Sequence, residues 1–380
     1  MAGNMSTATF DAVIVGAGIV GAACADEFAR RGMRVAVVDR DVVGSGATAA
    51  GMGHIVVMDD SEAQFALTRY SQRLWQALRP ELPADVEYEQ CGTIWVAADE
   101  EEMAEVRRKH DYYARLGVPT TVLDSQALQR LEPNLRDGMA GGLLVPEDAV
   151  LYPPCAARFL MERAQKHGAQ LRLGASVAQI GEGRVRLSDG LELAGDLIVN
   201  AAGAWAAELT NGIEIKKRKG HLVITDRYPG LLRHQLVELG YLKSAHSVSS
   251  DSVAFNVQPR RTGQILIGSS RQYGAEIKDV DHDILRRMLQ RAQEYMPALG
   301  PMSAVRTWTG FRAATHDKLP LIGPWPADKS LFLATGHEGL GITTSLATAR
   351  ILVDTITGSK SEISIEPYLP SRAREEYVHA

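Results

Sequence analysis

A strand, a glycine turn and a helix follow one another at the start of the chain, over residues 10–39. The apolar run 12–15 is short and rich in β-branched residues, which predicts a buried strand. An alanine-rich helix is expected from Ile19 and Val20 to about Arg31, where Gly32 closes it. A second strand over 35–38 then ends at Asp39. This order constrains the fold more than any other feature, because it describes one complete strand–helix–strand unit.

Each glycine of the turn has a physical role in a dinucleotide-binding unit. Gly16 permits the tight turn, Gly18 lets backbone approach a pyrophosphate, and Gly21 lets the helix pack on the strand. Asp39 follows the last glycine by 39 − 21 = 18 residues, where an acid accepts hydrogen bonds from an adenosine ribose. The unit predicts NAD or FAD and disfavours NADP, whose 2′-phosphate the acid would repel, although Arg40 beside it weakens that exclusion.

Composition excludes several classes of partner. The 380 residues, 45% of them hydrophobic, are enough for two domains. A formal net charge of −5 gives no bulk electrostatic reason to bind nucleic acid or an anionic membrane. The three cysteines are widely spaced and favour free thiols over disulfides or metal ligands. Because the N-terminal segment has no signal-peptide character, we expect a cytoplasmic protein, with peripheral membrane contact through an electron acceptor left open.

Small residues recur where backbone could close on a cofactor. The loop over 44–60 is rich in glycine and alanine and directly follows the nucleotide unit. A buried strand at 196–200 runs into the small-residue turn 201–204, and a strand at 331–335 runs into the glycine turn 336–341 and a helix. Ligands of parallel sheets bind at the carboxyl ends of strands, so both turns are further candidate cofactor contacts.

The middle of the chain predicts a second kind of sheet. A strand over 171–180 leads to a hairpin at Glu182 and Gly183. From 216 to 309, short strands separated by polar breaks surround one helix at 281–296, which indicates an antiparallel sheet with a covering helix. The expected fold class is therefore α/β plus α+β.

Together these stretches resemble the FAD-dependent D-amino-acid oxidase family, which includes glycine oxidase, sarcosine oxidase and the flavin subunits of proline and opine dehydrogenases. The resemblance covers nearly the whole chain. It rests on GAGIVG with Asp39, the loop at 44–54, LIVNAAGAW at 197–205, and GFRAATHDKLPLIGP at 310–324 followed by ATGHEGLGIT at 334–343. It implies a Rossmann-type FAD-binding domain interleaved with an antiparallel-sheet substrate domain. The expected divisions are 8–85, 150–215 and 320–358 for the FAD-binding domain, 86–149 and 216–319 for the substrate domain, and 359–380 for a C-terminal tail.

The resemblance also implies which residues hold FAD. The glycine turn with Ile19 and Val20 would bind the pyrophosphate, Asp39 and Arg40 would lie at the ribose, and Val177 would pair its backbone with the adenine. No cysteine lies in 310–324, where some sarcosine oxidases attach the flavin covalently, so non-covalent FAD is expected. The remaining cofactor contacts would come from Ser45, Thr48, Ala49, Gly51, Met52, His54, Ala202, Gly203, Trp205, Arg312, His337, Glu338, Gly339, Leu340, Gly341 and Ile342.

Two side chains are the expected catalytic residues. Arg312 matches the carboxylate-binding arginine of the family, and a guanidinium binds a carboxylate through two parallel hydrogen bonds. His54 would either take a proton from the substrate amine or hydrogen-bond the cofactor or backbone, and both interpretations stay open. The tyrosine that glycine oxidase-like members carry is replaced here by Asn256 or Phe255, so the substrate must be anchored differently. The expected substrate-pocket residues are Arg312, Asn256, Trp308, Tyr241 and Glu338, with no metal.

The implied reaction is oxidation of a D-amino or cyclic imino acid to the imine, with hydride passing from Cα to flavin N5. The loop AAGMGHIVVMDD at 49–60 is similar to that of D-hydroxyproline dehydrogenase and opine oxidase flavin subunits, which makes cis-4-hydroxy-D-proline and D-proline the first substrates to test. The alternatives are an oxygen-using glycine or sarcosine oxidase, an opine oxidase subunit, a non-catalytic FAD-binding subunit and an NAD-dependent dehydrogenase. The resemblance also makes an electron-accepting partner subunit or a homo-oligomer an expectation.

Overall fold

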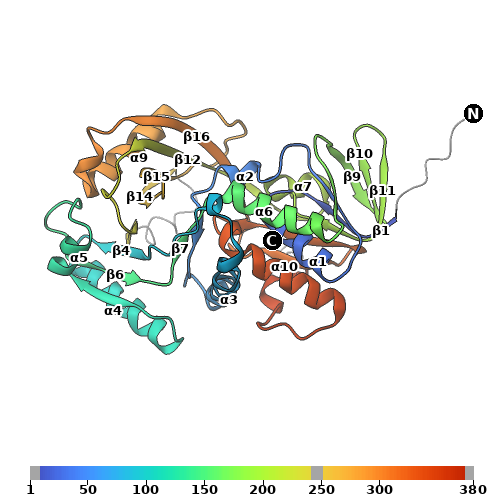
Figure 1. The fold of residues 1–380 in the computed structure, drawn as a ribbon, viewed down its shortest axis with the longest axis horizontal. Coiled ribbons are helices and arrows are strands. Elements are labelled where there is room, and N and C mark those ends of the chain that lie inside the picture. Colours follow the sequence, from blue (N-terminus) through green and yellow to red (C-terminus); the bar gives the residue numbers. More distant parts are fainter. Residues whose placement is uncertain (1–8, 241–250, 373–380) are drawn as a thin grey trace, which may run out of the picture.

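Two large β-sheets, each with its own helices, lie side by side (Figure 1). The computed structural model describes residues 9–240 and 251–372. One sheet has eight strands and the other nine, and a two-stranded ribbon, β3 (His54–Ile55) with β7 (Ala149–Val150), makes a third sheet. The helix α3 (Glu62–Leu78) lies near the centre of the view in Figure 1, between the two lobes.

The eight-stranded sheet has a parallel core. Strand β1 lies between β2 and β11, and β8, β2, β1, β11 and β18 all run parallel. Strand β17 closes one edge antiparallel to β18, and β9 and β10 extend β11 as a hairpin-linked ribbon. The strands are β17 (Leu321–Trp325), β18 (Asp328–Thr335), β11 (Glu192–Asn200), β1 (Thr9–Val15), β2 (Val35–Val38), β8 (Gln170–Arg172), β9 (Val177–Gly181) and β10 (Arg184–Leu187).

Helix α1 (Ile19–Arg30) is buried along most of its length because most of its residues are small or apolar. It packs against α6 (Pro153–Lys166) and α10 (Gly341–Thr357). Proline occupies the first positions of α6, where the missing N–H is not needed. Helix α10 ends at Gly358, whose φ of 67° is the left-handed conformation that glycine adopts without strain. This three-helix layer holds the parallel sheet from one side.

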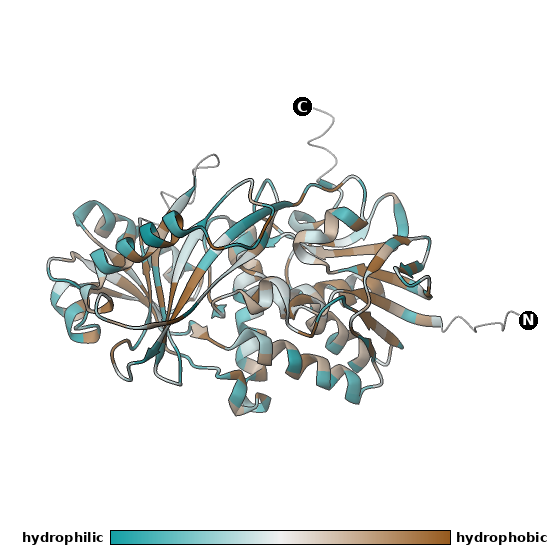
Figure 2. Cartoon of the chain, turned by 90° about the horizontal axis from the view of Figure 1, so that it is seen from above, coloured by the Kyte–Doolittle hydropathy of each residue, from teal (hydrophilic) through white to brown (hydrophobic). Residues whose placement is uncertain are grey.

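The nine-stranded sheet is antiparallel except where β13 runs parallel to β4. Its order is β19 (His337–Glu338), β16 (Ala304–Ala314), β12 (Lys216–Arg227), β15 (Gln264–Arg271), β14 (Ser252–Pro259), β13 (Gln235–Glu238), β4 (Thr93–Ala97), β6 (Gly141–Val145) and β5 (Thr121–Asp124). Helices α9 (His282–Tyr295), α4 (Glu100–Arg115) and α5 (Ser125–Leu131) belong to the same lobe, and the remaining short helices are α2 (Gly46–Ala49) and α7 (Ala206–Leu209). The strands of both lobes are largely apolar, whereas the outer helices of the left-hand lobe are mostly hydrophilic (Figure 2).

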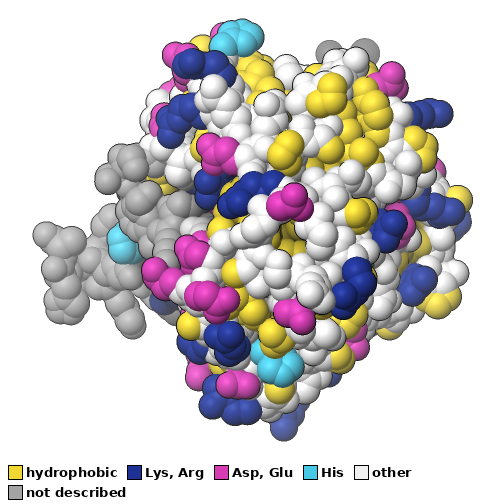
Figure 3. Space-filling view, turned by 90° about the vertical axis from the view of Figure 1, so that its left-hand side faces the viewer, with side chains coloured by type: hydrophobic (Ala, Val, Ile, Leu, Met, Phe, Trp, Pro, Cys, Tyr) yellow, Lys and Arg dark blue, Asp and Glu magenta, His cyan; other side chains and the backbone are white. Residues whose placement is uncertain are grey.

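The surface carries mixed charge. On the face seen in Figure 3, Lys and Arg side chains are interspersed with Asp and Glu, without a broad field of one sign. Among residues 9–240 and 251–372, no helix is both long enough and apolar enough to span a membrane.

The predicted fold class is confirmed, with two local differences. The single strand expected over 171–180 is wrong: β8 and β9 are separate strands, divided at Gly174, which has a φ of 68°. The strand expected at 305–308 extends to Ala314, so Arg312 lies within β16 and not in a loop. The division into two domains at the expected boundaries remains a proposal.

Candidate functional site

A cavity of about 390 Å³ lies between the two sheets. The segments that follow the carboxyl ends of β1, β2 and β11 line one part of it, at Gly16, Asp39 and Ala201. The face of the nine-stranded sheet lines the other part, with Arg312 and Asn256. The carboxyl edge of a parallel sheet is where such folds bind ligands, so the cavity is the candidate active site.

The glycine turn is close-packed. A Cβ atom on Gly16 would lie 2.5 Å from the carbonyl oxygen of Ala201, and the φ of Gly16 is 111°. The Ile19 N–H donates to Thr48 Oγ1 over 3.0 Å. Gly18 is the N-cap of α1, which has no side-chain cap and no acidic residue in its first turn. The start of the helix therefore presents backbone N–H groups to the cavity, as a pyrophosphate requires.

Asp39 directly follows β2, and each of its carboxylate oxygens accepts a hydrogen bond from the backbone. Oδ2 accepts from the N–H of Ala17 over 2.6 Å, and Oδ1 accepts from the N–H of Asp41 over 2.8 Å. Each oxygen has a second lone pair, so the carboxylate can still accept from ribose hydroxyls. The Arg40 guanidinium lies 4.3 Å from the centre of the Trp205 ring, which fixes the two side chains beside Asp39.

The small-residue loop packs against the start of α10. A Cβ on Gly51 would lie 2.7 Å from Cδ1 of Ile342, and one on Gly53 would lie 1.9 Å from the carbonyl oxygen of Leu151. Thr343 Oγ1 donates to the His54 carbonyl over 2.8 Å. Helix α10, like α1, has no side-chain cap and no acidic residue in its first turn. The loop is thus held at a second helix N-terminus that faces the cavity.

The Arg312 side chain lines the cavity and lies close to two glycines, Gly220 and Gly339. Its Nη1 donates to the carbonyl oxygen of Ser270 over 2.9 Å. A Cβ on Gly220 would lie 2.7 Å from Arg312 Nη1, and one on Gly339 would lie 3.5 Å from Arg312 Nε. Side chains at these positions would displace the guanidinium. The glycines therefore define its place in the wall of the cavity.

Glu338 of β19 is bound by Arg218 of β12, across the intervening strand β16. The Arg218 guanidinium donates to its carboxylate over 2.5 Å, and both side chains are about nine-tenths buried. His337 lies beside it, and burial lowers the pKa of this imidazole to about 3. Its Nε2 contacts Thr348 Oγ1 at 2.9 Å, inside α10. We therefore assign His337 to holding the start of α10 and not to proton transfer.

His54 lies in the cavity wall next to Arg312. Burial first, and the positive charge of Arg312 second, lower the pKa of His54 to about 4. Its Nε2 atom is buried and has no hydrogen-bond partner among the residues that the structure describes. The imidazole is therefore neutral at physiological pH, with one unpartnered ring nitrogen in a residue that lines the cavity.

The structure brings most of the expected site residues together. Three do not line the cavity. Gly21 packs against the turn, where a Cβ would lie 1.9 Å from the Gly16 carbonyl oxygen, as its packing role predicts. Ala49 and Trp308 do not line it either: Ala49 is exposed on α2, and Trp308 packs beside Met52 and Leu222, which do line the cavity. Tyr241 lies outside the described residues. The expected residues that line the cavity are Gly16, Gly18, Ile19, Val20, Asp39, Arg40, Ser45, Thr48, Gly51, Met52, His54, Val177, Ala202, Gly203, Trp205, Asn256, Arg312, His337, Glu338, Gly339, Leu340, Gly341 and Ile342.

Several cavity residues were not predicted. They come from α3, from the loop before it and from β4, β13 and β15, which have unremarkable strand and helix sequences. One sequence signal was available for β12. Side chains alternate between the two faces of a strand, so Arg218, Gly220 and Leu222 share one face, and that face lines the cavity. The unpredicted residues used below are Gln64, Trp95, Gln235, Val237 and Arg271.

A sequence model of the DAO family, described as FAD dependent oxidoreductase, matches residues 11–355. The chain belongs to this family and is an FAD-dependent oxidoreductase. Glycine oxidase of Geobacillus kaustophilus is 28% identical over 381 residues, covering 96% of this chain and 98% of the relative. Hydrogen cyanide synthase subunit HcnC of Pseudomonas aeruginosa is 29% identical over 421 residues, covering 97% of both.

Solved structures agree on the fold. The crystal structure of the Geobacillus kaustophilus glycine oxidase superimposes with a TM-score of 0.85 at 28% identity, over 95% of this chain and 98% of that one. L-proline dehydrogenase from P. horikoshii gives a TM-score of 0.85 at 24% identity, over 96% and 98% of the two chains.

The residues present fit FAD. The uncapped N-termini of α1 and α10, the glycines at 16 and 18 and the ordered carboxylate of Asp39 all face one cavity. The three cysteines are all described residues, and none of them lines it. Non-covalent attachment remains a prediction: acid denaturation should release all the flavin from the polypeptide.

Proposed function

We propose that this protein oxidises the C–N bond of an amino or cyclic imino acid whose carboxylate is bound by Arg312. The observation that carries the proposal is the place of the Arg312 guanidinium, which lies over Gly220 in the wall of the cavity that the FAD-binding segments share. A guanidinium there can form two parallel hydrogen bonds with a carboxylate. Amino and imino acids carry that carboxylate one bond from the carbon that is oxidised.

Bound FAD supplies the two-electron acceptor for the hydride of Cα, while the nitrogen gives up a proton and the imine is left. The protein's part is to bind and orient. Arg312 fixes the carboxylate, which limits the directions in which the Cα–H bond can point. Neutral His54 can accept a hydrogen bond from the substrate amine through its unpartnered Nε2. Met52 and Leu222 form an apolar wall that keeps water from the reacting carbon.

Among substrates, D-proline and cis-4-hydroxy-D-proline are the first candidates. The likeness of the loop at 49–60 to D-hydroxyproline dehydrogenase flavin subunits supports this choice. A glycine or sarcosine oxidase is the second candidate, because a relative named glycine oxidase aligns over 96% of this chain. An opine oxidase subunit, in which a further chain accepts the electrons, is the third.

Anaerobic mixing separates these candidates. The purified holoenzyme is mixed with D-proline, cis-4-hydroxy-D-proline, other D-amino acids, glycine, sarcosine and opines, and loss of the flavin absorbance is followed. We expect rapid loss with the D-prolines and slow recovery when oxygen is admitted, which would indicate a different electron acceptor. Loss with glycine or sarcosine and fast recovery with peroxide formation would establish the second candidate. No loss with any amino or imino acid would contradict the proposal.

A further inference from the structure

A cluster of hydrogen-bonding side chains lies in the cavity on the side of the nine-stranded sheet. We define the amide cluster as Gln64, Trp95, Gln235 and Asn256, all of which line the same cavity as Arg312. None of them belongs to the segments assigned to FAD. Their positions follow from sheet register, because Asn256 of β14 pairs with Val237 of β13, and Val237 pairs with Trp95 of β4.

The register places these side chains on one face. Residues directly opposite in neighbouring strands point the same way, so Asn256, Val237 and Trp95 form a row about 10 Å long. Gln235 is two residues before Val237 and lies on the same face, about 7 Å along the strand. Gln64 comes from α3 and lines the same cavity. The cluster therefore surrounds a space large enough for one small polar group.

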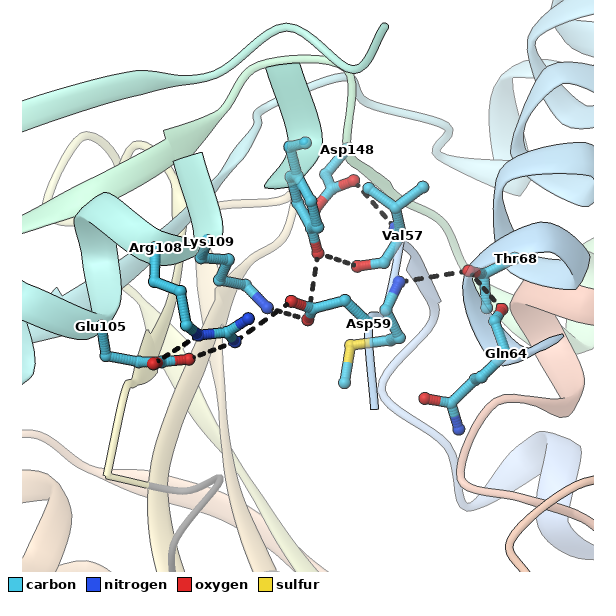
Figure 4. A network of polar contacts seen from close by, with 10 residues as sticks. Val57, Asp59, Gln64, Thr68, Glu105, Arg108, Lys109 and Asp148 are labelled. Carbon is cyan, nitrogen blue, oxygen red and sulfur yellow. Dashed lines mark hydrogen bonds and ion pairs between the residues drawn. The ribbon is translucent and has the colours of Figure 1, made fainter. Parts of the chain in front are cut away.

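The polar atoms of the amide cluster are buried without partners. Oδ1 of Asn256, Oε1 of Gln235, Oε1 of Gln64 and Nε1 of Trp95 make no hydrogen bond with any described residue. In Figure 4 the backbone carbonyl of Gln64 accepts from Thr68, but its side-chain amide has no contact drawn. Leaving one buried polar group unpaired costs about 1–3 kcal/mol. Four such atoms belong to residues that line one cavity, so a polar ligand group that reached one or two of them would gain hydrogen bonds that the protein alone does not make.

The cluster is rigidly supported (Figure 4). Lys109 of α4 is fully buried and forms an ion pair with Asp59. Its Nζ lies 4.8 Å from the centre of the Trp95 ring, and Tyr113 Oη donates to the Val57 carbonyl over 3.3 Å. These contacts hold the Trp95 indole and the loop before α3 in place.

The donors and acceptors in the cluster define the chemistry of the ligand group. Each amide of the cluster has an oxygen that accepts and an NH2 group that donates, and the indole N–H of Trp95 also donates. A hydroxyl donates one hydrogen and accepts through two lone pairs, so it can pair with an amide oxygen and with an N–H together, whereas a carboxylate can only accept and leaves the amide oxygens unpaired. Resting on the proposed function, we propose that the amide cluster binds a hydroxyl group of the substrate, on the side away from the carboxylate that Arg312 holds.

Arg271 favours a different ligand group, a second carboxylate. It lines the same cavity from β15, and its positive charge would favour a second carboxylate. The test therefore includes a dicarboxylate. Tighter binding of iminodiacetate than of a hydroxylated monocarboxylate would overturn the hydroxyl proposal.

The test uses two ring acids that cannot be oxidised to an imine: tetrahydrofuran-2-carboxylate and its 4-hydroxy derivative. Each is titrated into the holoenzyme, and binding is measured from the change in flavin absorbance. We expect the hydroxylated acid to bind at least about tenfold tighter to the natural protein, corresponding to about 1.4 kcal/mol. In Asn256→Leu and in Gln235→Met this preference should fall below about threefold, while the unsubstituted acid binds about as before.

Gln258→Met is the matched control. Gln258 is a fully buried amide two residues from Asn256 on β14, but it does not line the cavity, so this variant should keep the preference. Asn256→Ser retains a hydrogen-bonding group and should keep part of it. Equal binding of both acids by the natural protein, or equal weakening of both in the apolar variants, would overturn the inference.

The same titration tests the proposed function separately. Arg312→Lys should weaken both ring acids by the same factor, because each carries one carboxylate. If it weakens neither, the proposed function fails, whatever the hydroxyl preference is. If it weakens both and the preference is absent, the amide cluster inference alone fails.

Discussion

His54 faces the cavity as a neutral imidazole, and this state limits what it can do. Its pKa is lowered to about 4, so the protonated form is rare above pH 5. A base with so low a pKa has little driving force to take a proton from an amine. At the residue scale, the two roles left open by the sequence are therefore not equally favoured. A hydrogen bond to the substrate or cofactor suits His54 better than proton transfer.

We expect His54→Gln to leave the pH dependence of kcat/KM unchanged between pH 6 and 9. Gln keeps a hydrogen-bonding group but cannot titrate, and His54 is already neutral across that range. The measurement is kcat/KM against pH for both proteins, with the substrate found in the anaerobic panel. A limb of the profile that disappears in the variant would show that His54 titrates in this range.

Arg312→Lys tests the carboxylate site. Lysine keeps the charge but cannot form two parallel hydrogen bonds, so kcat/KM should fall by about 10- to 100-fold. The flavin absorbance spectrum and the flavin content should be unchanged, which separates a substrate effect from loss of FAD. A variant with the kinetic constants of the natural protein would remove Arg312 from the site.

At the scale of elements, a glycine sets how closely a strand of the nine-stranded sheet approaches the loop that follows β2. Gly310 of β16 lies against α2, and a Cβ on Gly310 would be 2.2 Å from Cβ of Ala50. Strand β16 can approach the loop at 44–54 only because this position has no side chain. The contact positions the cofactor loop against the strand that carries Arg312.

We expect Gly310→Ala to separate β16 from the loop. FAD should bind more weakly, and the free energy of unfolding should fall by roughly 1–3 kcal/mol, as for other overpacked contacts. Gly181→Ala on β9 is the control, because a Cβ there would meet nothing within 4 Å. FAD affinity is measured by quenching of flavin fluorescence and stability by denaturant titration. Equal effects of the two substitutions would contradict the steric argument.

The cofactor segments could be predicted because their signals are local. A strand followed by small residues marks the carboxyl edge of a parallel sheet, and this pattern pointed to Gly16, Gly18 and residues 201–205, all of which line the cavity. Gln235 and Trp95 could not be found this way. They lie on separate strands with ordinary apolar neighbours, and sheet register alone brings them beside Asn256. That Ala49 does not line the cavity could not be predicted either, since the direction of a side chain on a one-turn helix is not visible in a small-residue run.

At the scale of the whole molecule, Asp148 ties together segments between the two sheets. Its Oδ1 accepts from Gln72 Nε2 of α3 over 2.9 Å and from the Val57 N–H over 3.2 Å. Burial raises the pKa of this carboxyl to about 7, although these hydrogen bonds lower it. Between the unfolded pKa of 3.8 and the folded value, the folded protein holds a proton that the unfolded chain has lost. Stability is therefore lost as pH rises through that window.

Asp148→Asn should remove this part of the pH dependence. The amide keeps an oxygen for Gln72 and Val57 but carries no ionisable proton. We expect the free energy of unfolding of the natural protein to fall more than that of the variant between pH 5 and pH 8, by at most about 1.4 kcal/mol per pH unit, and Tm to fall with it. The exposed Asp137→Asn serves as the control. Parallel Tm curves for the natural protein and Asp148→Asn would contradict the assignment.

The strand order of the parallel sheet has a consequence for how the protein is made. Strands β1 and β2 leave the ribosome first, but β11, which pairs with β1, and β18, which pairs with β11, begin only at residues 192 and 328. At ~5–20 residues per second, the interval from residue 38 to residue 328 is about 15 to 60 s. Throughout that time the first nucleotide-binding turn lacks the α10 N-terminus, and until residue 201 has been made it also lacks the Ala201 carbonyl. The FAD site is therefore complete only late in synthesis. When FAD is scarce, we expect full-length apoprotein to accumulate rather than incomplete chains.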